Sequence, residues 1–94
     1  MNMKIKQITE WIKTAMQQKL DYFKNYNYEV IKDSEDKYNI KVFNTSSANV
    51  ITGSALLYIA EVLEIAEKRM PCIITSYVQS ANGRPEYMII INKK

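Results

Sequence analysis

The hydrophobic pattern is strongest in the middle of the chain, from Gly53 to Met70. Apolar residues recur there at intervals of three and four, the spacing of an amphipathic helix. The positions are Leu56, Ile59, Leu63, Ala66 and Met70, with Ala55, Val62, Tyr58 and Ile65 beside them. At 3.6 residues per turn they cover an arc of roughly 180–220°. One side of such a helix can pack on a sheet, and we expect the other side to need a second helix or another subunit.

Both ends of this helix carry recognisable signals. Thr52 or Ser54 can act as the N-cap, because a side-chain hydroxyl accepts a free backbone N–H of the first turn. Pro71 cannot continue the helix and favours an extended conformation at the residue before it, Met70.

A first helix is predicted from Met3 to about Lys24. Its apolar positions repeat with the same period: Ile5, Ile8, Ile12, Ala15, Met16, Leu20 and Phe23. Trp11 lies at the edge of this face, and three lysines, Lys6, Lys13 and Lys24, share the opposite flank. Asn25 is a residue type that commonly ends a helix.

The remaining segments alternate with a period of two, which is typical of half-buried strands. We expect strands over residues 26–31, 37–44, 72–79 and 86–92. Turns are predicted over residues 33–36 and 80–85, and Asn82-Gly83 is the strongest hairpin signal. The last strand is apolar on both faces, which predicts a central position in its sheet or cover on both sides.

The element order is therefore helix–strand–strand–helix–strand–strand, a twofold structural repeat. Ninety-four residues correspond to one domain. We predict a single α+β domain over residues 1–94, in which two helices cover one face of an antiparallel four-stranded sheet.

Several kinds of chemistry are disfavoured by what the chain contains. It has no histidine, the commonest general base and metal ligand, so no Ser–His or Cys–His pair can form. Cys72 is the single cysteine and is expected to be a buried thiol. Gly53 and Gly83 are isolated, which excludes the known phosphate-binding loops. The acids of residues 33–36 lack the calcium-loop pattern. We expect no enzymatic activity, no cofactor and no metal site.

Charge and hydropathy suggest a folded protein in a reducing compartment. The net charge is +3, and Lys and Arg alternate with Asp and Glu without a polybasic block. No run approaches the ~18 apolar residues of a membrane span, and the first residues lack the apolar core of a signal peptide. Together with the single cysteine, this favours the cytoplasm and no membrane partner.

The surplus of aromatic and apolar residues favours a protein-binding module. Trp and Tyr are enriched as interface anchors. The expected partner-binding residues are Trp11, Tyr22, Tyr26, Tyr28, Leu57 and Tyr58. A thin core gains stability by pairing with a second copy, so we expect a homodimer. The competing explanation is that the tyrosines only line the rim of the core.

The general profile, a short chain without catalytic residues, resembles that of small accessory proteins from phages and mobile elements, including anti-restriction and anti-CRISPR inhibitors. The resemblance is one of type and is carried by no motif. It implies action by occluding or bridging a partner protein, as an inhibitor or an adaptor.

The alternative function is nucleic-acid binding. Lys37, Lys41 and Phe43 share one face of a predicted strand, and Tyr77 is expected to join them from another. Aromatic side chains flanked by Lys or Arg stack single-stranded bases. Phosphates would then be contacted by the helix flank of Lys6, Lys13 and Lys24. The simpler explanation of that flank is a solvated lysine face.

Overall fold

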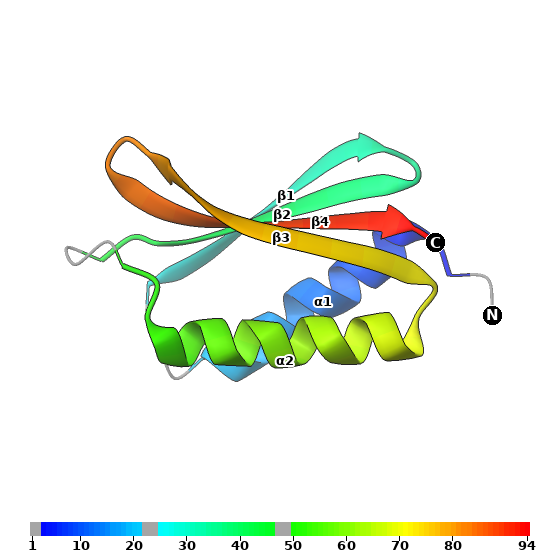
Figure 1. The fold of residues 1–94 in the computed structure, drawn as a ribbon, viewed down its shortest axis with the longest axis horizontal. Coiled ribbons are helices and arrows are strands. Elements are labelled where there is room, and N and C mark those ends of the chain that lie inside the picture. Colours follow the sequence, from blue (N-terminus) through cyan, green and yellow to red (C-terminus); the bar gives the residue numbers. More distant parts are fainter. Residues whose placement is uncertain (1–2, 22–24, 47–49) are drawn as a thin grey trace.

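The computed structural model describes residues 3–21, 25–46 and 50–94. Two helices and four strands follow in the predicted order: α1 (Ile5–Leu20), β1 (Tyr26–Ser34), β2 (Lys37–Asn44), α2 (Gly53–Arg69), β3 (Cys72–Ala81) and β4 (Arg84–Lys93). The strands form one antiparallel sheet in the order β1-β2-β4-β3. Both helices lie on the same face of this sheet (Figure 1). The predicted α+β class and arrangement are confirmed.

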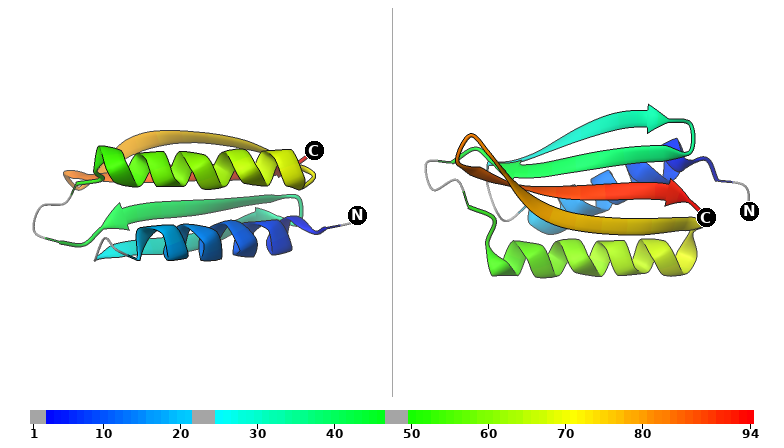
Figure 2. Two further views of the ribbon diagram at one scale, coloured as in Figure 1. Left: turned by 90° about the horizontal axis from the view of Figure 1, so that it is seen from below. Right: turned by 45° about the horizontal axis from the view of Figure 1, so that its top comes forward.

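The strand order reveals the structural repeat expected from the element order. Exchanging α1-β1-β2 with α2-β3-β4 converts the order β1-β2-β4-β3 into its own reverse. A pseudo-twofold axis therefore passes between the antiparallel strands β2 and β4. Figure 2 shows α1 and α2 side by side and antiparallel, as this axis requires. β1 and β3 are thus equivalent edges of the two halves.

A single hydrophobic core lies between the helices and the sheet. Its fully buried members include Ile8, Ile12 and Met16 of α1, Ala55, Ile59 and Ala66 of α2, and Ile40, Val42, Ile89 and Ile91 of the sheet. The broad apolar arc of α2 is covered mostly within one chain, by the sheet and by α1. Among the residues described for α2, Leu57 and Tyr58 are the large apolar side chains that remain exposed.

The ends of α2 follow the local signals. Thr52, not Ser54, is the N-cap, and its Oγ1 accepts the Ala55 N–H at 3.1 Å. Met70, before Pro71, is extended with φ −126° and ψ 150°, as predicted. The predicted first helix was too long, since α1 ends at Leu20; Lys24 lies outside the described residues.

The strands are longer and the turns shorter than the sequence suggested. β1 continues to Ser34, which pairs with Lys37 beyond an irregularity at Asp33. β3 continues to Ala81 and β4 begins at Arg84, because these two residues still pair across the hairpin. The β3–β4 turn is therefore only Asn82-Gly83, with φ 54° and 74°. Two positive φ values are the requirement of a type I′ hairpin.

β4 is central, as its two apolar faces predicted. In the described part of the chain, neither helix has the length and apolar character needed to cross a bilayer.

Candidate functional site

Three of the expected partner-binding residues lie on the layer formed by α1 and α2: Trp11, Leu57 and Tyr58. Lys19 of α1 and Glu61 of α2 form an ion pair at 3.3 Å, which identifies the sides on which the two helices face each other. Helical periodicity then places Trp11 and Ala15 on the same side of α1 as Lys19, and Tyr58 and Ile65 on the same side of α2 as Glu61. We call these six residues the inter-helix surface.

Trp11 and Tyr58 are each 39% exposed, and Leu57, on the solvent side of α2, is 73% exposed. Because the helices are antiparallel, Trp11 and Tyr58 lie on opposite sides of the Lys19–Glu61 pair. At 1.5 Å per residue their separation along the helix axes is roughly 16 Å. This spacing suits two anchors within one protein interface.

The other expected anchors do not join this surface. Tyr26 and Tyr28 lie on β1, half-buried against the core, and the Tyr26 hydroxyl accepts the Thr52 N–H at 3.2 Å. Burial, followed by the nearby Tyr26 and Asp21, raises the pKa of Tyr28 to about 12. Both tyrosines therefore support the core rim. Tyr22 lies outside the described residues.

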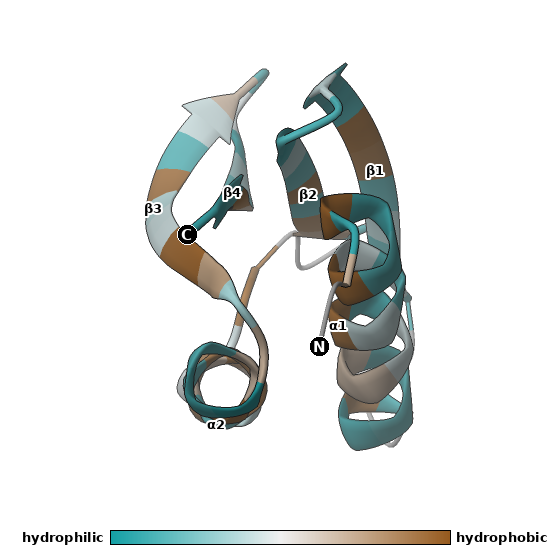
Figure 3. Cartoon of the chain, turned by 90° about the vertical axis from the view of Figure 1, so that its right-hand side faces the viewer, coloured by the Kyte–Doolittle hydropathy of each residue, from teal (hydrophilic) through white to brown (hydrophobic). Residues whose placement is uncertain are grey.

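The second candidate surface is the face of the sheet opposite the helices, called here the outer face (Figure 3). Lys37, Lys41 and Phe43 of β2 lie on it, as their alternation predicted. The pairing of Lys41 with Met88 and of Met88 with Tyr77 brings Tyr77 into the same row. The sequence-based grouping of these four residues is therefore geometrically sound.

An acidic residue near the start of β4 changes the electrostatics of the outer face. Glu86 is only 3% exposed. It accepts hydrogen bonds from Gln79 Nε2 at 3.1 Å and from Arg84 Nη2 at 3.3 Å, and Lys41 Nζ lies 3.9 Å away. Burial favours a raised pKa, but these hydrogen bonds and the charges of Lys41 and Arg84 outweigh it, so the pKa of Glu86 is lowered.

The lysines of the outer face are also paired with acids. Lys41 lies 3.9 Å from Glu29 as well as from Glu86, and Lys37 lies 3.7 Å from Asp33. The Arg84 guanidinium stacks over the Phe43 ring at 4.1 Å. Gln79, Arg84 and Glu86 were not predicted from the sequence, because the pairing of β3 with β4 brings them together and the pairing of β4 with β2 places them beside Phe43.

Two of the three lysines predicted on the first helix lie on the other side of the molecule from the outer face. Lys6 and Lys13 are on α1, which covers the opposite face of the sheet, and Lys24 lies outside the described residues. The seven candidate nucleic-acid residues therefore do not form one continuous patch.

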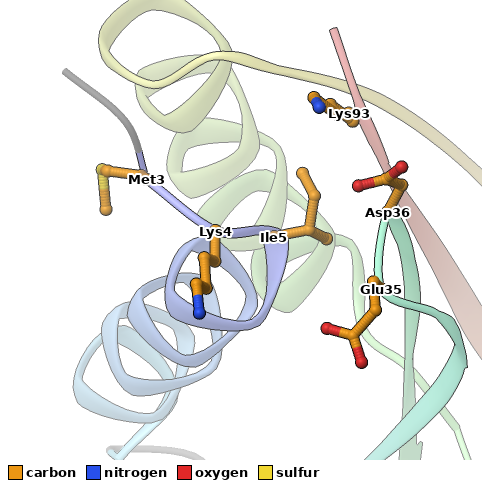
Figure 4. A pocket seen from close by; sticks show the side chains of 6 residues that line it. All are labelled: Met3, Lys4, Ile5, Glu35, Asp36 and Lys93. Carbon is orange, nitrogen blue, oxygen red and sulfur yellow. The ribbon is translucent and has the colours of Figure 1, made fainter.

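A cavity of ≈ 420 Å³ lies where the start of α1 meets the β1–β2 turn (Figure 4). Two lysines and two carboxylates contribute to its lining: Lys4, Lys93, Glu35 and Asp36, with Met3 and Ile5. Glu35 forms an ion pair with Lys32. Among the described residues, no group of three or more acidic or cysteine side chains is arranged to hold a metal ion. The cavity therefore offers balanced charge and no identifiable chemistry.

Cys72 is buried, as predicted. Burial, and then the nearby Glu67, raises the pKa of its thiol. A thiol that stays protonated is a poor nucleophile.

Comparisons of the chain with protein-family models, with curated proteins and with solved structures found no match.

Proposed function

We propose that the chain is a small, non-enzymatic protein-binding module that binds its partner through the inter-helix surface and Leu57. The observation that carries the proposal is the 73% exposure of Leu57 on the solvent side of a regular helix, one residue from Tyr58. An isolated exposed leucine is ordinary on a protein surface. Its position next to a tyrosine and on the same helix layer as the tryptophan is typical of an interface.

The layout suits a partner that presents an apolar ridge. Trp11 and Tyr58 can anchor such a ridge at its two ends, and the Lys19–Glu61 pair between them can fix its orientation. Full burial of a leucine side chain contributes about 1.5–3 kcal/mol relative to leaving it exposed. Leu57 alone therefore adds substantially to the affinity of a small interface.

The module acts by covering or bridging the partner's own surface, as the inhibitors of phages and mobile elements that it resembles do. We place it in the cytoplasm, which is consistent with a buried single thiol. Nucleic-acid binding is less well supported, because Lys37 and Lys41 are neutralised by acids and Arg84 occupies one face of Phe43.

The test is affinity capture from a lysate of the cells that encode the chain, with and without nuclease and at low and high salt. Three baits are compared: wild type, Trp11→Gln/Leu57→Glu, and Tyr77→Gln. Tyr77 is a matched control, since it is 48% exposed but lies on the outer face.

We expect a protein that survives nuclease and high salt, is lost with Trp11→Gln/Leu57→Glu, and is retained with Tyr77→Gln. Circular dichroism confirms that each bait is folded. Capture that disappears with nuclease or falls steeply with salt would instead support nucleic-acid binding. Capture that depends on Tyr77 and not on Trp11 and Leu57 would move the site to the outer face.

A further inference from the structure

The two edges of the sheet occupy equivalent positions in the repeat but differ in how they are protected. β1 carries charged residues, including Glu29, Lys32 and Asp33, and its pairing with β2 is irregular between Lys32 and Ser34. Charges and bulges are the usual means by which proteins block pairing at an edge strand. β3 has neither: its ten residues, CIITSYVQSA, are uncharged, and they pair with β4 in unbroken register.

The free backbone groups of β3 can be identified from one hydrogen bond. The Ile74 N–H does not bind β4 but donates to Glu67 Oε2 of α2 at 3.0 Å. Outward-facing backbone groups alternate along an edge strand, so those of Ser76, Val78 and Ser80 face the same way as those of Ile74. Within the described residues, nothing accepts or donates to them. Figure 3 shows β3 at the margin of the sheet with α2 beneath it, so the helix leaves this edge open.

We propose that this edge pairs with β3 of a second copy of the chain, antiparallel, with Val78 opposite Val78. Because the Ile74 N–H already donates to Glu67, the stretch with free outward-facing backbone groups runs from Ser76 to Ser80 and is centred on Val78. Ser76 of each copy then lies opposite Ser80 of the other, and each such pair exchanges both backbone hydrogen bonds. The result is a continuous sheet through two copies, related by a twofold axis.

The side chains at the edge favour a second copy over a foreign strand. Val78, 56% exposed on the helix side, meets its own equivalent at the axis and is buried. Tyr77, exposed on the outer face, lies beside the partner's Gln79. Ser76 and Ser80 are small, and Ser76 lines a crevice of ≈ 250 Å³ between β3 and α2.

Charge does not oppose this pairing. Glu64 and Glu67 lie in the C-terminal half of α2, beside the first half of the antiparallel strand β3. Across a twofold axis at Val78, that acidic half faces the N-terminal half of the other α2. Residues 53–60 there are GSALLYIA, without charge. Specific interfaces bury about 1,200 Å² or more in total, so these helix flanks must contribute beside the strands.

The dimer extends the proposed function without depending on it. A twofold axis perpendicular to the sheet leaves both helix layers on the same side. Two inter-helix surfaces would then be presented together, which would allow one dimer to bridge two partner molecules. The residues of the edge and of the inter-helix surface are different, so each proposal fails separately.

The first test is sedimentation of the purified full chain over a wide range of concentration. We expect a monomer–dimer equilibrium in the wild type, weakened more than about tenfold by Val78→Lys, which places like charges opposite each other at the axis. Val50→Lys is the matched control, because Val50 is 47% exposed and lies outside the strands.

The second test is oxidative cross-linking, which reports the register. Across an antiparallel hydrogen-bonded pair the Cα atoms are about 5.5 Å apart, within the range of a disulfide. Val78→Cys should therefore form a covalent dimer. Thr75→Cys should not, because Thr75 lies opposite Ala81 in this register, and wild type should not, because Cys72 is buried.

A wild type that remains monomeric at every concentration overturns the proposal. A dimer that persists in Val78→Lys also overturns the proposal, whether or not Leu57→Glu removes it. Cross-linking of Thr75→Cys in place of Val78→Cys overturns the register. A monomer whose Val78→Lys variant loses a captured partner protein would assign the edge to a foreign strand instead.

Discussion

Arg84 stacks its guanidinium over the ring of Phe43 at 4.1 Å, joining β4 to β2 on the outer face of the sheet. The same guanidinium donates to Glu86 at 3.3 Å, and Gln79 donates to that carboxylate from β3. The buried carboxylate of Glu86 therefore lies on a face that no described helix covers. Side chains from β2, β3 and β4 compensate its charge. This explains how Glu86 can be 3% exposed without an unpaired charge.

Replacing Glu86 with Ala should lower the free energy of unfolding by about 1–3 kcal/mol at neutral pH, because Arg84, Gln79 and Lys41 lose their shared acceptor. Urea denaturation measures the change. Glu29→Ala is the control, since Glu29 also lies 3.9 Å from Lys41 but is exposed. Exposed ion pairs contribute about 1 kcal/mol or less. An equal loss in both variants would show that the position of Glu86 on the sheet is unimportant.

The same residue predicts a pH dependence. The pKa of Glu86 is lowered in the folded chain from an ordinary value of 4.5. Its contribution is therefore present above pH 4.5 and is lost as pH falls through the folded pKa. The difference in unfolding free energy between wild type and Glu86→Gln should shrink as acid is added below that value. A difference that grows on acidification would contradict the lowered pKa.

Tyr28 predicts a loss of stability at alkaline pH, whereas Glu86 predicts one in acid. Burial first, and then Tyr26 and Asp21, raise its pKa from 10.0 to about 12. The folded state thus retains a proton that the unfolded chain releases, and stability falls as pH rises from 10 towards 12. Tyr28→Phe should reduce this loss, measured as unfolding free energy at several alkaline pH values. Ultraviolet titration should show a late-ionising tyrosine in wild type that is missing from the variant.

The N-cap of α2 offers a matched pair of hydroxyl deletions. Thr52→Ala removes the acceptor of the Ala55 N–H and should cost about 0.5–2 kcal/mol. Ser54→Ala, two residues away and exposed, should change stability little and serves as the control. Thermal unfolding followed by circular dichroism compares the two. A larger loss of stability in Ser54→Ala than in Thr52→Ala would show that Thr52 is not the N-cap.

The two glycines should respond in opposite directions to alanine. Gly83 has φ 74°, so Gly83→Ala forces a side chain into the left-handed region and should destabilise by roughly 1–2 kcal/mol. Gly53 is in the first turn of α2 with open space around it. Gly53→Ala should be neutral or stabilise by up to about 1 kcal/mol, since alanine restricts the unfolded chain. Denaturant midpoints of both variants measure this contrast.

Periodicity was sufficient where a residue's neighbours along the chain decide its environment. The alternation of residues 37–44 placed Lys37, Lys41 and Phe43 on one face of the strand, and all three are on the outer face of β2. Thr52 and Pro71 correctly marked the ends of α2. In each case the signal depends on backbone geometry over a few residues, which local sequence controls.

Periodicity was insufficient where the packing of distant segments decides. Residue type left two explanations for Tyr26 and Tyr28, a partner-binding surface and the core rim, and the structure packs both half-buried against the core. The apolar arc of α2 was expected to need a second helix or another subunit, and the packing of α1 against it decides for the helix. The cluster of Gln79, Arg84 and Glu86 with Phe43 had no sequence signal, because strand order and register create it.

The amino-acid sequence alone determined the element types, their order, the end of α2 before Pro71 and the Asn82-Gly83 hairpin, since hydrogen bonding and sterics over a few residues set each of them. Tertiary structure alone decided which apolar residues stay exposed, which charges meet, and which strands form the two edges of the sheet beside the predicted central strand β4. Those properties depend on how antiparallel strands are ordered and paired, and residues far apart in sequence contact each other only once that pairing is made.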